Sequence, residues 1–132
     1  MDLNIDKLVT RPLPASLLSK INKCPTAREL LKAWRKINTR KKWCKDTVAR
    51  DKNNSPVDAT SRKAVRFCAQ GAMESICASF LAQDYLMNAS IELHPDEFDH
   101  TGVNDHLGYA AVRKVFRLAI LQALRGDLDN EY

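Results

Sequence analysis

Residues 60–86 carry the longest apolar pattern in the chain, TSRKAVRFCAQGAMESICASFLAQDYL. Its hydrophobic residues recur at the helical period, and few polar residues interrupt the inner face. The pattern predicts a central, buried helix from Thr60 to Leu86. Gly71 lies inside this helix, where a glycine costs about 1 kcal/mol relative to alanine. We therefore expect a neighbouring helix to approach closely at that point.

Two further helices are predicted on either side of this stretch. One begins at Thr26, because Thr-Ala-Arg-Glu at residues 26–29 has the spacing of a capping box and an apolar face follows. The other runs from Gly108 to Leu124, where apolar residues again form one stripe. The inner faces of the three helices should bury Trp34, Phe67, Ile76, Phe80, Val115, Phe116 and Ile120.

The remaining segments are shorter or more polar. Residues 43–50 are consistent with a short helix or with a bent continuation of the helix before it. Residues 51–56 concentrate turn formers and predict a surface loop. Residues 88–107 are polar and acidic, so we expect a long acidic loop before the last helix.

The chain has 132 residues, of which 45% are hydrophobic and 28% charged, as is typical of a globular protein with one core. We predict an all-α fold, a compact bundle of about four helices, in which residues 1–25 form an N-terminal arm with one short helix and residues 26–132 a single helical domain. No apolar stretch approaches the roughly 20 residues that cross a bilayer. The first residues carry two acids where a signal peptide is basic, so we expect a cytoplasmic protein without a membrane partner.

Three motifs together resemble a known pattern. They are WCKDTVARD at residues 43–51, AVRFCAQGA at residues 64–72, and the pair Asn104-Asp105 ahead of the last helix. The combination resembles an uncharacterised family of short bacterial and phage proteins, catalogued as a domain of unknown function, over roughly residues 27–121. The resemblance implies a helical fold and no activity. Family members often carry a glycine after the Ala-Arg-Asp stretch, where this chain has Asn53-Asn54, so the turn there can differ.

The strongest electrostatic feature lies between Lys20 and Lys52, where 12 Lys and Arg residues face three Asp and Glu residues. It predicts a basic face that binds an anionic partner such as nucleic acid, a nucleotide or an acidic protein. The residues assigned to this basic face are Lys32, Arg35, Lys36, Lys41, Lys42 and Lys45. Trp34 and Trp43 could stack on bases only if they are exposed. The alternative is a solvated helix face with both tryptophans in the core, since charge runs usually serve solubility.

A polar set recurs in the family-like motifs: Arg50, Asp51, Arg66, Asn104 and Asp105. If the fold brings these residues together, an arginine fork over a carboxylate could hold a phosphate, a nucleotide or a small polar ligand. The simpler alternative is structural. In it, Asp105 caps the last helix, Asp51 ends the second, and Arg66 pairs with one of the two carboxylates.

Residues 67–112 contain no Lys or Arg, and His94, His100 and His106 lie there among several acids. These histidines are weak candidates for a metal site, because their spacing matches neither His-Glu-x-x-His nor a calcium-binding loop. An acidic surface loop is the favoured interpretation. Cys68 lies among apolar residues and is expected to be a buried structural thiol.

No catalytic motif and no cofactor-binding motif is present in the sequence, so the question of an enzyme stays open and leans toward none. Three functions follow, in this order: a small non-catalytic binding module, a protein-protein interaction factor such as a phage-encoded inhibitor of a host machine, and a metal- or nucleotide-dependent enzyme. The sequence leaves the oligomeric state open.

Overall fold

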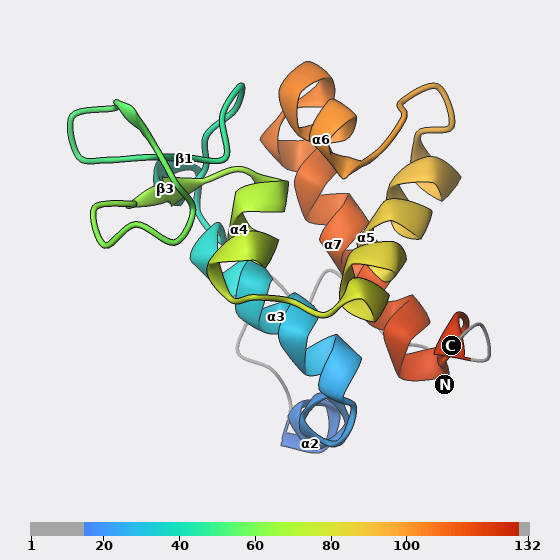
Figure 1. Ribbon diagram of the computed structural model, residues 1–132. Coiled ribbons are helices and arrows are strands. Elements are labelled where there is room, and N and C mark those ends of the chain that lie inside the picture. The colour runs from blue at the N-terminus through green and yellow to red at the C-terminus, as the bar shows by residue number, and fades with distance from the viewer. Residues whose placement is uncertain (1–14, 130–132) are drawn as a thin grey trace.

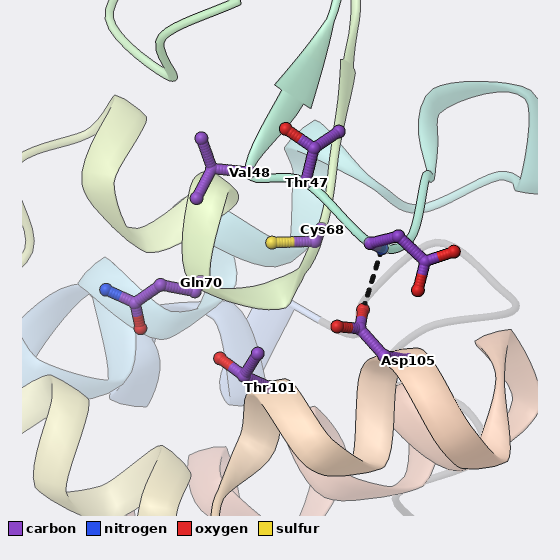
Figure 2. A pocket seen from close by; sticks show the side chains of 7 residues that line it. Thr47, Val48, Cys68, Gln70, Thr101 and Asp105 are labelled. Carbon is purple, nitrogen blue, oxygen red and sulfur yellow. Dashed lines mark hydrogen bonds between the residues drawn. The ribbon is translucent and has the colours of Figure 1, made fainter. Parts of the chain in front are cut away.

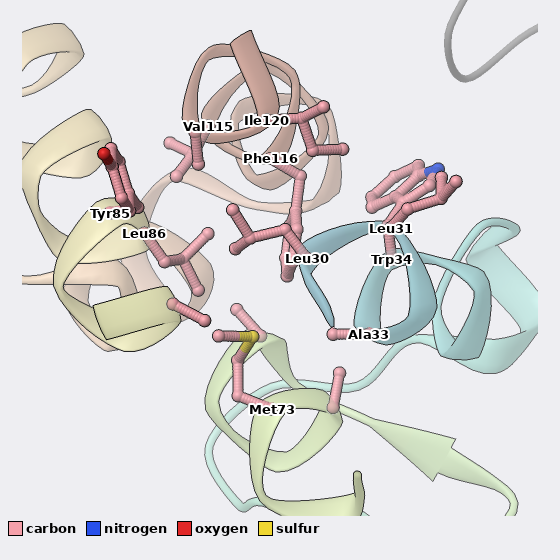
Figure 3. Packing of buried hydrophobic residues seen from close by; sticks show 14 of the residues in the cluster. Leu30, Leu31, Ala33, Trp34, Met73, Tyr85, Leu86, Val115, Phe116 and Ile120 are labelled. Atoms are coloured by element: carbon pink, nitrogen blue, oxygen red, sulfur yellow. The ribbon is translucent and has the colours of Figure 1, made fainter. Parts of the chain in front are cut away.

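Three helices enclose the core of the protein. The computed structural model describes residues 15–129, in which α3 (Pro25–Lys36), α5 (Phe80–Leu93) and α7 (Tyr109–Arg125) pack against one another (Figure 1). Figure 3 shows Leu30 of α3, Leu86 of α5 and Phe116 of α7 meeting in the interior. Burial of such aliphatic and aromatic side chains is the main favourable term in folding.

The last helix agrees with its prediction. α7 follows Gly108, whose φ is 91°, and ends at Gly126, a left-handed C-cap with φ 71°. Left-handed backbone favours glycine, so the two residues bound the helix. Within these bounds, one stripe of α7 is buried, comprising Val112, Val115, Phe116, Ala119, Ile120 and Ala123.

The predicted capping box at Thr26 is wrong. α3 begins one residue earlier, with Pro25 in its first turn and Cys24 as the N-cap, and no side chain caps it. Proline suits this position because its fixed φ is already helical and its missing N–H would be unpaired there anyway. Glu29 accepts hydrogen bonds from Ser79 instead, at 2.9 Å from the backbone N and 2.7 Å from Oγ.

A short helix, α2 (Ala15–Lys23), precedes α3, as expected for the arm. Its Ile21 is fully buried against the core. Residues 1–14, the rest of the predicted arm, lie outside the described residues. Within the described part of the chain, no helix combines the length and the apolar character needed to cross a membrane.

The single helix predicted over residues 60–86 is wrong. This stretch divides into β3 (Arg66–Phe67), α4 (Ala69–Ser75) and the start of α5. Two breaks separate them: Cys68 has extended backbone, and Cys77 has a φ of 53°, which no helix accommodates. Apolar periodicity does not register such breaks, because each side of a break continues to bury apolar residues.

A small sheet makes the fold predominantly helical rather than purely α. Its strands β1 (Ala49–Arg50), β2 (Pro56–Val57) and β3 pair antiparallel in the order β2-β1-β3. Residues 43–50 were expected to form a short helix or a bent continuation of the helix before them. Instead, η1 (Arg40–Lys42), a single 3-10 turn, comes before this stretch, and β1 lies at its end. The loop predicted at 51–56 is found at residues 51–55, where it is the turn that joins β1 to β2, and Pro56 already belongs to β2.

The long loop predicted over residues 88–107 is also wrong. α5 continues to Leu93, and α6 (His100–Gly102) leads directly into η2 (Val103–Leu107), a π-helix. Polar composition hid these helices, because much of their surface faces solvent. Within the stretch expected to be a loop, residues 94–99 form the one connection without helix or strand.

Gly71 is required by a close approach, but the neighbour is not a helix. A Cβ at this position would lie 1.8 Å from the carbonyl oxygen of Val48. The same carbonyl accepts a hydrogen bond of 3.1 Å from the backbone N of Cys68. Gly71 therefore lets α4 pack directly on the chain entering β1.

Most of the predicted core is buried: Trp34, Phe67, Val115, Phe116 and Ile120. Ile76 is half-buried beside the core. The prediction that Phe80 is buried is wrong. Phe80 lies in the first turn of α5, on the face that points to solvent, and is 82% exposed.

Candidate functional site

The six residues of the basic face are all exposed. They lie on α3, on η1 and in the turn that follows η1, at the end of α3 nearest the sheet (Figure 1). None of the six is ion-paired with a carboxylate of residues 15–129. The ammonium group of Lys36 lies 5.8 Å from the ring centroid of Phe67.

Positive charge continues from the basic face onto the sheet. Residues 40–66 contain nine Lys and Arg residues against three Asp residues, whereas residues 67–112 contain no Lys or Arg. Lys52, Arg62 and Lys63 line a groove of about 540 Å³ beside the β1–β2 turn. Composition alone did not single out these three residues, because the groove exists only once the turn and the loop at 58–65 fold beside each other.

Arg50 and Arg66 lie opposite each other on β1 and β3. Arg50 donates hydrogen bonds to the carbonyl oxygens of Asn54, at 3.0 Å, and Lys45, at 3.3 Å. Arg66 donates to Oδ1 of Asn54 at 3.4 Å. We refer to Arg50 and Arg66 as the arginine pair, and both of its guanidinium groups therefore reach the same asparagine.

Asp51 shapes the turn beside the arginine pair. Its Oδ1 accepts hydrogen bonds from the backbone N atoms of Asn53, at 2.9 Å, and Ser55, at 3.0 Å. Asn54 then adopts left-handed backbone with a φ of 65°. Asparagine tolerates this conformation better than most residues, which explains how the turn forms without a glycine at this position.

Asn104 is fully buried and uses all of its side-chain hydrogen-bonding capacity. Its Oδ1 accepts from Nε1 of Trp43 at 2.7 Å and from the backbone N of Ala69 at 2.9 Å. Its Nδ2 donates to the carbonyl oxygen of Cys44 at 3.1 Å and to Oδ1 of Asp105 at 3.0 Å. Asn104 thus fastens the chain before β1 and the start of α4 to the π-helix.

Asp105 also serves this junction and does not cap α7. Its Oδ1 accepts a hydrogen bond of 3.0 Å from the backbone N of Asp46, shown as a dashed line in Figure 2. The predicted polar set therefore divides between two places, the arginine pair with Asp51 at the sheet, and Asn104 with Asp105 on η2. The segment from Trp43 to Asp46 connects the two places. Asn104 and Asp105 bond to it from η2, and Arg50 bonds to it from the sheet.

A small pocket opens at this junction (Figure 2). Its volume is about 140 Å³, and its lining residues are Asp46, Thr47, Val48, Cys68, Gln70, Thr101 and Asp105. Ligand pockets usually measure about 300–1,000 Å³, so this one suits a few water molecules better than a substrate.

The buried thiols near this pocket are poor nucleophiles. Burial is the main reason that the pKa of Cys44 is raised to about 11, and Cys68 nearby raises it further. Burial also raises the pKa of Cys68, whose Sγ accepts a hydrogen bond from the backbone N of Gly71 at 3.2 Å. A thiol must ionise to attack, so the raised pKa values make both thiols unreactive. The hydrogen bond from Gly71 gives Cys68 a structural role instead, as the N-cap of α4.

The three histidines lie in different settings. Burial lowers the pKa of His100, whose Nε2 lies 2.5 Å from Oε1 of Gln70. Nδ1 of the exposed His106 donates a hydrogen bond to Oε2 of Glu97 at 2.9 Å, and this bond raises the pKa of His106. His94 ends α5 as its C-cap. Within residues 15–129, no three His, Cys, Asp or Glu residues are grouped closely enough to hold a metal ion.

Comparison of the chain with protein-family models, with curated proteins and with solved structures finds no match. The resemblance inferred from the three motifs therefore stays a prediction.

Proposed function

We propose that this chain is a small non-catalytic binding module and that its basic face engages an anionic partner. The observation that carries the proposal is the exposure of all six residues of the basic face without ion-paired carboxylates among the described residues. The six cations lie within 14 residues of the chain, on α3, on η1 and in the turn that follows η1. Like charges on one segment repel one another, and an anionic partner relieves that repulsion while releasing its own counterions.

The favoured partner is the backbone of a nucleic acid. Trp34 is buried and stacks on Tyr109, with ring centroids 5.9 Å apart. Trp43 is half-buried and donates its indole N–H to Asn104. Neither indole is free to stack on a base, so the proposal rests on phosphate contacts, which carry little sequence preference.

The test is binding to a fluorescent DNA duplex, followed by anisotropy at several salt concentrations. Reversing Lys32, Arg35 and Lys36 to Glu should abolish binding and leave the helical circular-dichroism signal and the melting temperature nearly unchanged. Neutralising one contact should flatten the negative slope of log affinity against log salt by about 0.9.

A matched control reverses Lys23, Arg28 and Lys114 to Glu, which makes the same charge change at residues other than the six assigned to the basic face. All three are exposed. This control should weaken binding far less than the first triple variant. If the wild-type protein binds neither DNA, RNA nor an acidic protein at low salt, the basic face is only a solvated surface.

A second candidate function, a protein-protein interaction factor, is favoured by the outer face of α5. Phe80, Met87 and Ile91 lie on one face of this helix and are 82%, 40% and 44% exposed. Because residues 67–112 lack Lys and Arg but contain seven acids, the fitting partner is a protein segment that carries both apolar and basic residues. Loss of a co-purifying protein on F80E, with DNA binding retained, would assign the function to this face.

A further inference from the structure

We propose that the arginine pair is a phosphate-binding site in addition to the basic face, and that it holds one phosphate group between the two guanidinium groups. This inference rests on the proposed function, because the phosphate is taken to belong to a nucleic-acid backbone. It adds a specific site to what is otherwise a diffuse positive surface.

The first argument is the placement of two like charges. Arg50 and Arg66 are directly paired across antiparallel strands, where like charges destabilise a sheet. Neither is ion-paired with a carboxylate of the described residues. The nearest acid in sequence, Asp51, directs its Oδ1 to two backbone N–H groups of the turn. An anion bridging the two guanidinium groups would remove the repulsion.

The second argument is that the two side chains are held in place. Asn54 receives both of them, one at its carbonyl oxygen and one at its side-chain oxygen, and Lys45 provides a second carbonyl for Arg50. Each guanidinium carries five N–H donors, and the contacts to Asn54 and Lys45 occupy a minority of them. Preorganised forks with donors to spare match the oxygens of a phosphate.

The third argument is the positive charge that adjoins the pair in sequence. A groove of about 540 Å³ is lined by Asp51 and Val65, which follow Arg50 and precede Arg66, and also by Lys52, Arg62 and Lys63. Neither residue of the arginine pair lines this groove. The three cations raise the positive potential around the β1–β2 turn, which attracts a phosphodiester chain toward the strands that carry the arginine pair.

The experiment measures duplex DNA binding by anisotropy for R66Q and R66K. R66Q should lower the affinity at least about tenfold, because a charge-assisted hydrogen-bonding partner is lost. R66K keeps the charge but loses the fork, and it should also weaken binding several-fold with an unchanged salt slope. The matched control is R28Q, a neutralised exposed arginine in the first turn of α3, which should change the affinity less than about twofold.

Stability provides a second readout. Arg66 is exposed and makes one long hydrogen bond to Asn54, so R66Q should melt at the same temperature as wild type or higher. Inorganic phosphate, compared with chloride at equal ionic strength, should raise the melting temperature of wild type and not of R66Q. It should also shift the Nε–Hε NMR signals of Arg50 and Arg66 but not that of Arg28.

The outcomes separate this inference from the proposed function. If R66Q and R66K bind duplex DNA as R28Q does, while the reversal of Lys32, Arg35 and Lys36 abolishes binding, the basic face holds the partner and the arginine pair does not. If wild type binds no polyanion, the proposed function fails, and the phosphate titration alone decides the pair. Shifts confined to Arg50 and Arg66 then support a site for free phosphate or a phosphate monoester, and their absence overturns the inference.

Discussion

Replacing Asn104 with alanine should destabilise the protein more than any other single polar truncation in the junction beside the sheet. The substitution leaves Nε1 of Trp43, the backbone N of Ala69 and the carbonyl oxygen of Cys44 without their partner. A buried polar group left unsatisfied costs about 1–3 kcal/mol. Water can reach the half-buried indole, so we expect a total loss of about 3–5 kcal/mol rather than the full sum.

The assay is urea unfolding followed by tryptophan fluorescence, with the free energy of unfolding taken by linear extrapolation. The matched control is Asn88→Ala, because the Asn88 side chain makes one described bond, to Gln122 at 3.3 Å. That control should lose about 1 kcal/mol. A double-mutant cycle of N104A with W43F should show a coupling energy of about 1 kcal/mol or more.

Two results would refute this reasoning. One is a loss for N104A no greater than that for the Asn88 control. The other is a coupling energy near zero between Asn104 and Trp43, which would mean that the indole finds an equivalent partner in water. Either result would remove Asn104 as the fastening point of the sheet.

Three other predictions follow from close packing and burial. Gly71→Ala should lower the free energy of unfolding by at least about 3 kcal/mol, because the added Cβ would lie 1.8 Å from the Val48 carbonyl oxygen and backbone cannot rotate away. Chemical denaturation measures this loss. Burial holds the pKa of His100 in the folded protein below its ordinary 6.5. The contribution of neutral His100 to the free energy of unfolding should therefore be complete above pH 6.5 and decline as the pH falls toward the folded pKa. In unfolding experiments at several pH values, H100Q should make this decline shallower. Cys77 is exposed and should react with a thiol reagent in the folded protein, whereas Cys44 should react only on unfolding.

Each of these predictions has an internal control. The Cβ of Gly102→Ala would meet the side chain of Glu97, with Oε2 at 2.7 Å, and a side chain can shift more easily than backbone, so this change should be tolerated better than the change at Gly71. His106 has a raised pKa, so replacing it should not flatten the loss of stability on acidification. Rapid labelling of the buried thiol at Cys68 in the folded state would contradict the tight packing of α4.

The sequence predicted α7 well because two glycines bound it and one apolar stripe fills it. It failed at residues 60–86, where the breaks at Cys68 and Cys77 interrupt the backbone without interrupting the apolar pattern. Two-residue strands are too short to show alternation, so the sheet had no periodic signal. At the start of α3, two start signals adjoined, and the proline in the first turn took precedence over the Thr-x-x-Glu spacing.

The candidate site was predictable in composition and not in geometry. Exposure of the basic face followed from its charge run, since lysines rarely bury their ammonium groups. The arginine pair depends on the register of β1 and β3, which brings together residues 16 positions apart. Asn104 was noticed as part of a motif, but its partners lie 35 and 61 residues away, and such distant contacts leave no local pattern.

The bond between Trp43 and Asn104 also sets an order of events during synthesis. The two residues are separated by 61 positions, and a ribosome adds about 5–20 residues per second. About 3–12 s therefore pass between the synthesis of the indole and that of its buried partner, and emergence from the exit tunnel follows the same order. During that interval α3 can form, but the turn that carries Lys45 lacks its hydrogen bonds to Asn104 and Asp105. The basic face thus gains its full support only after the chain has been synthesised as far as Asn104 and Asp105.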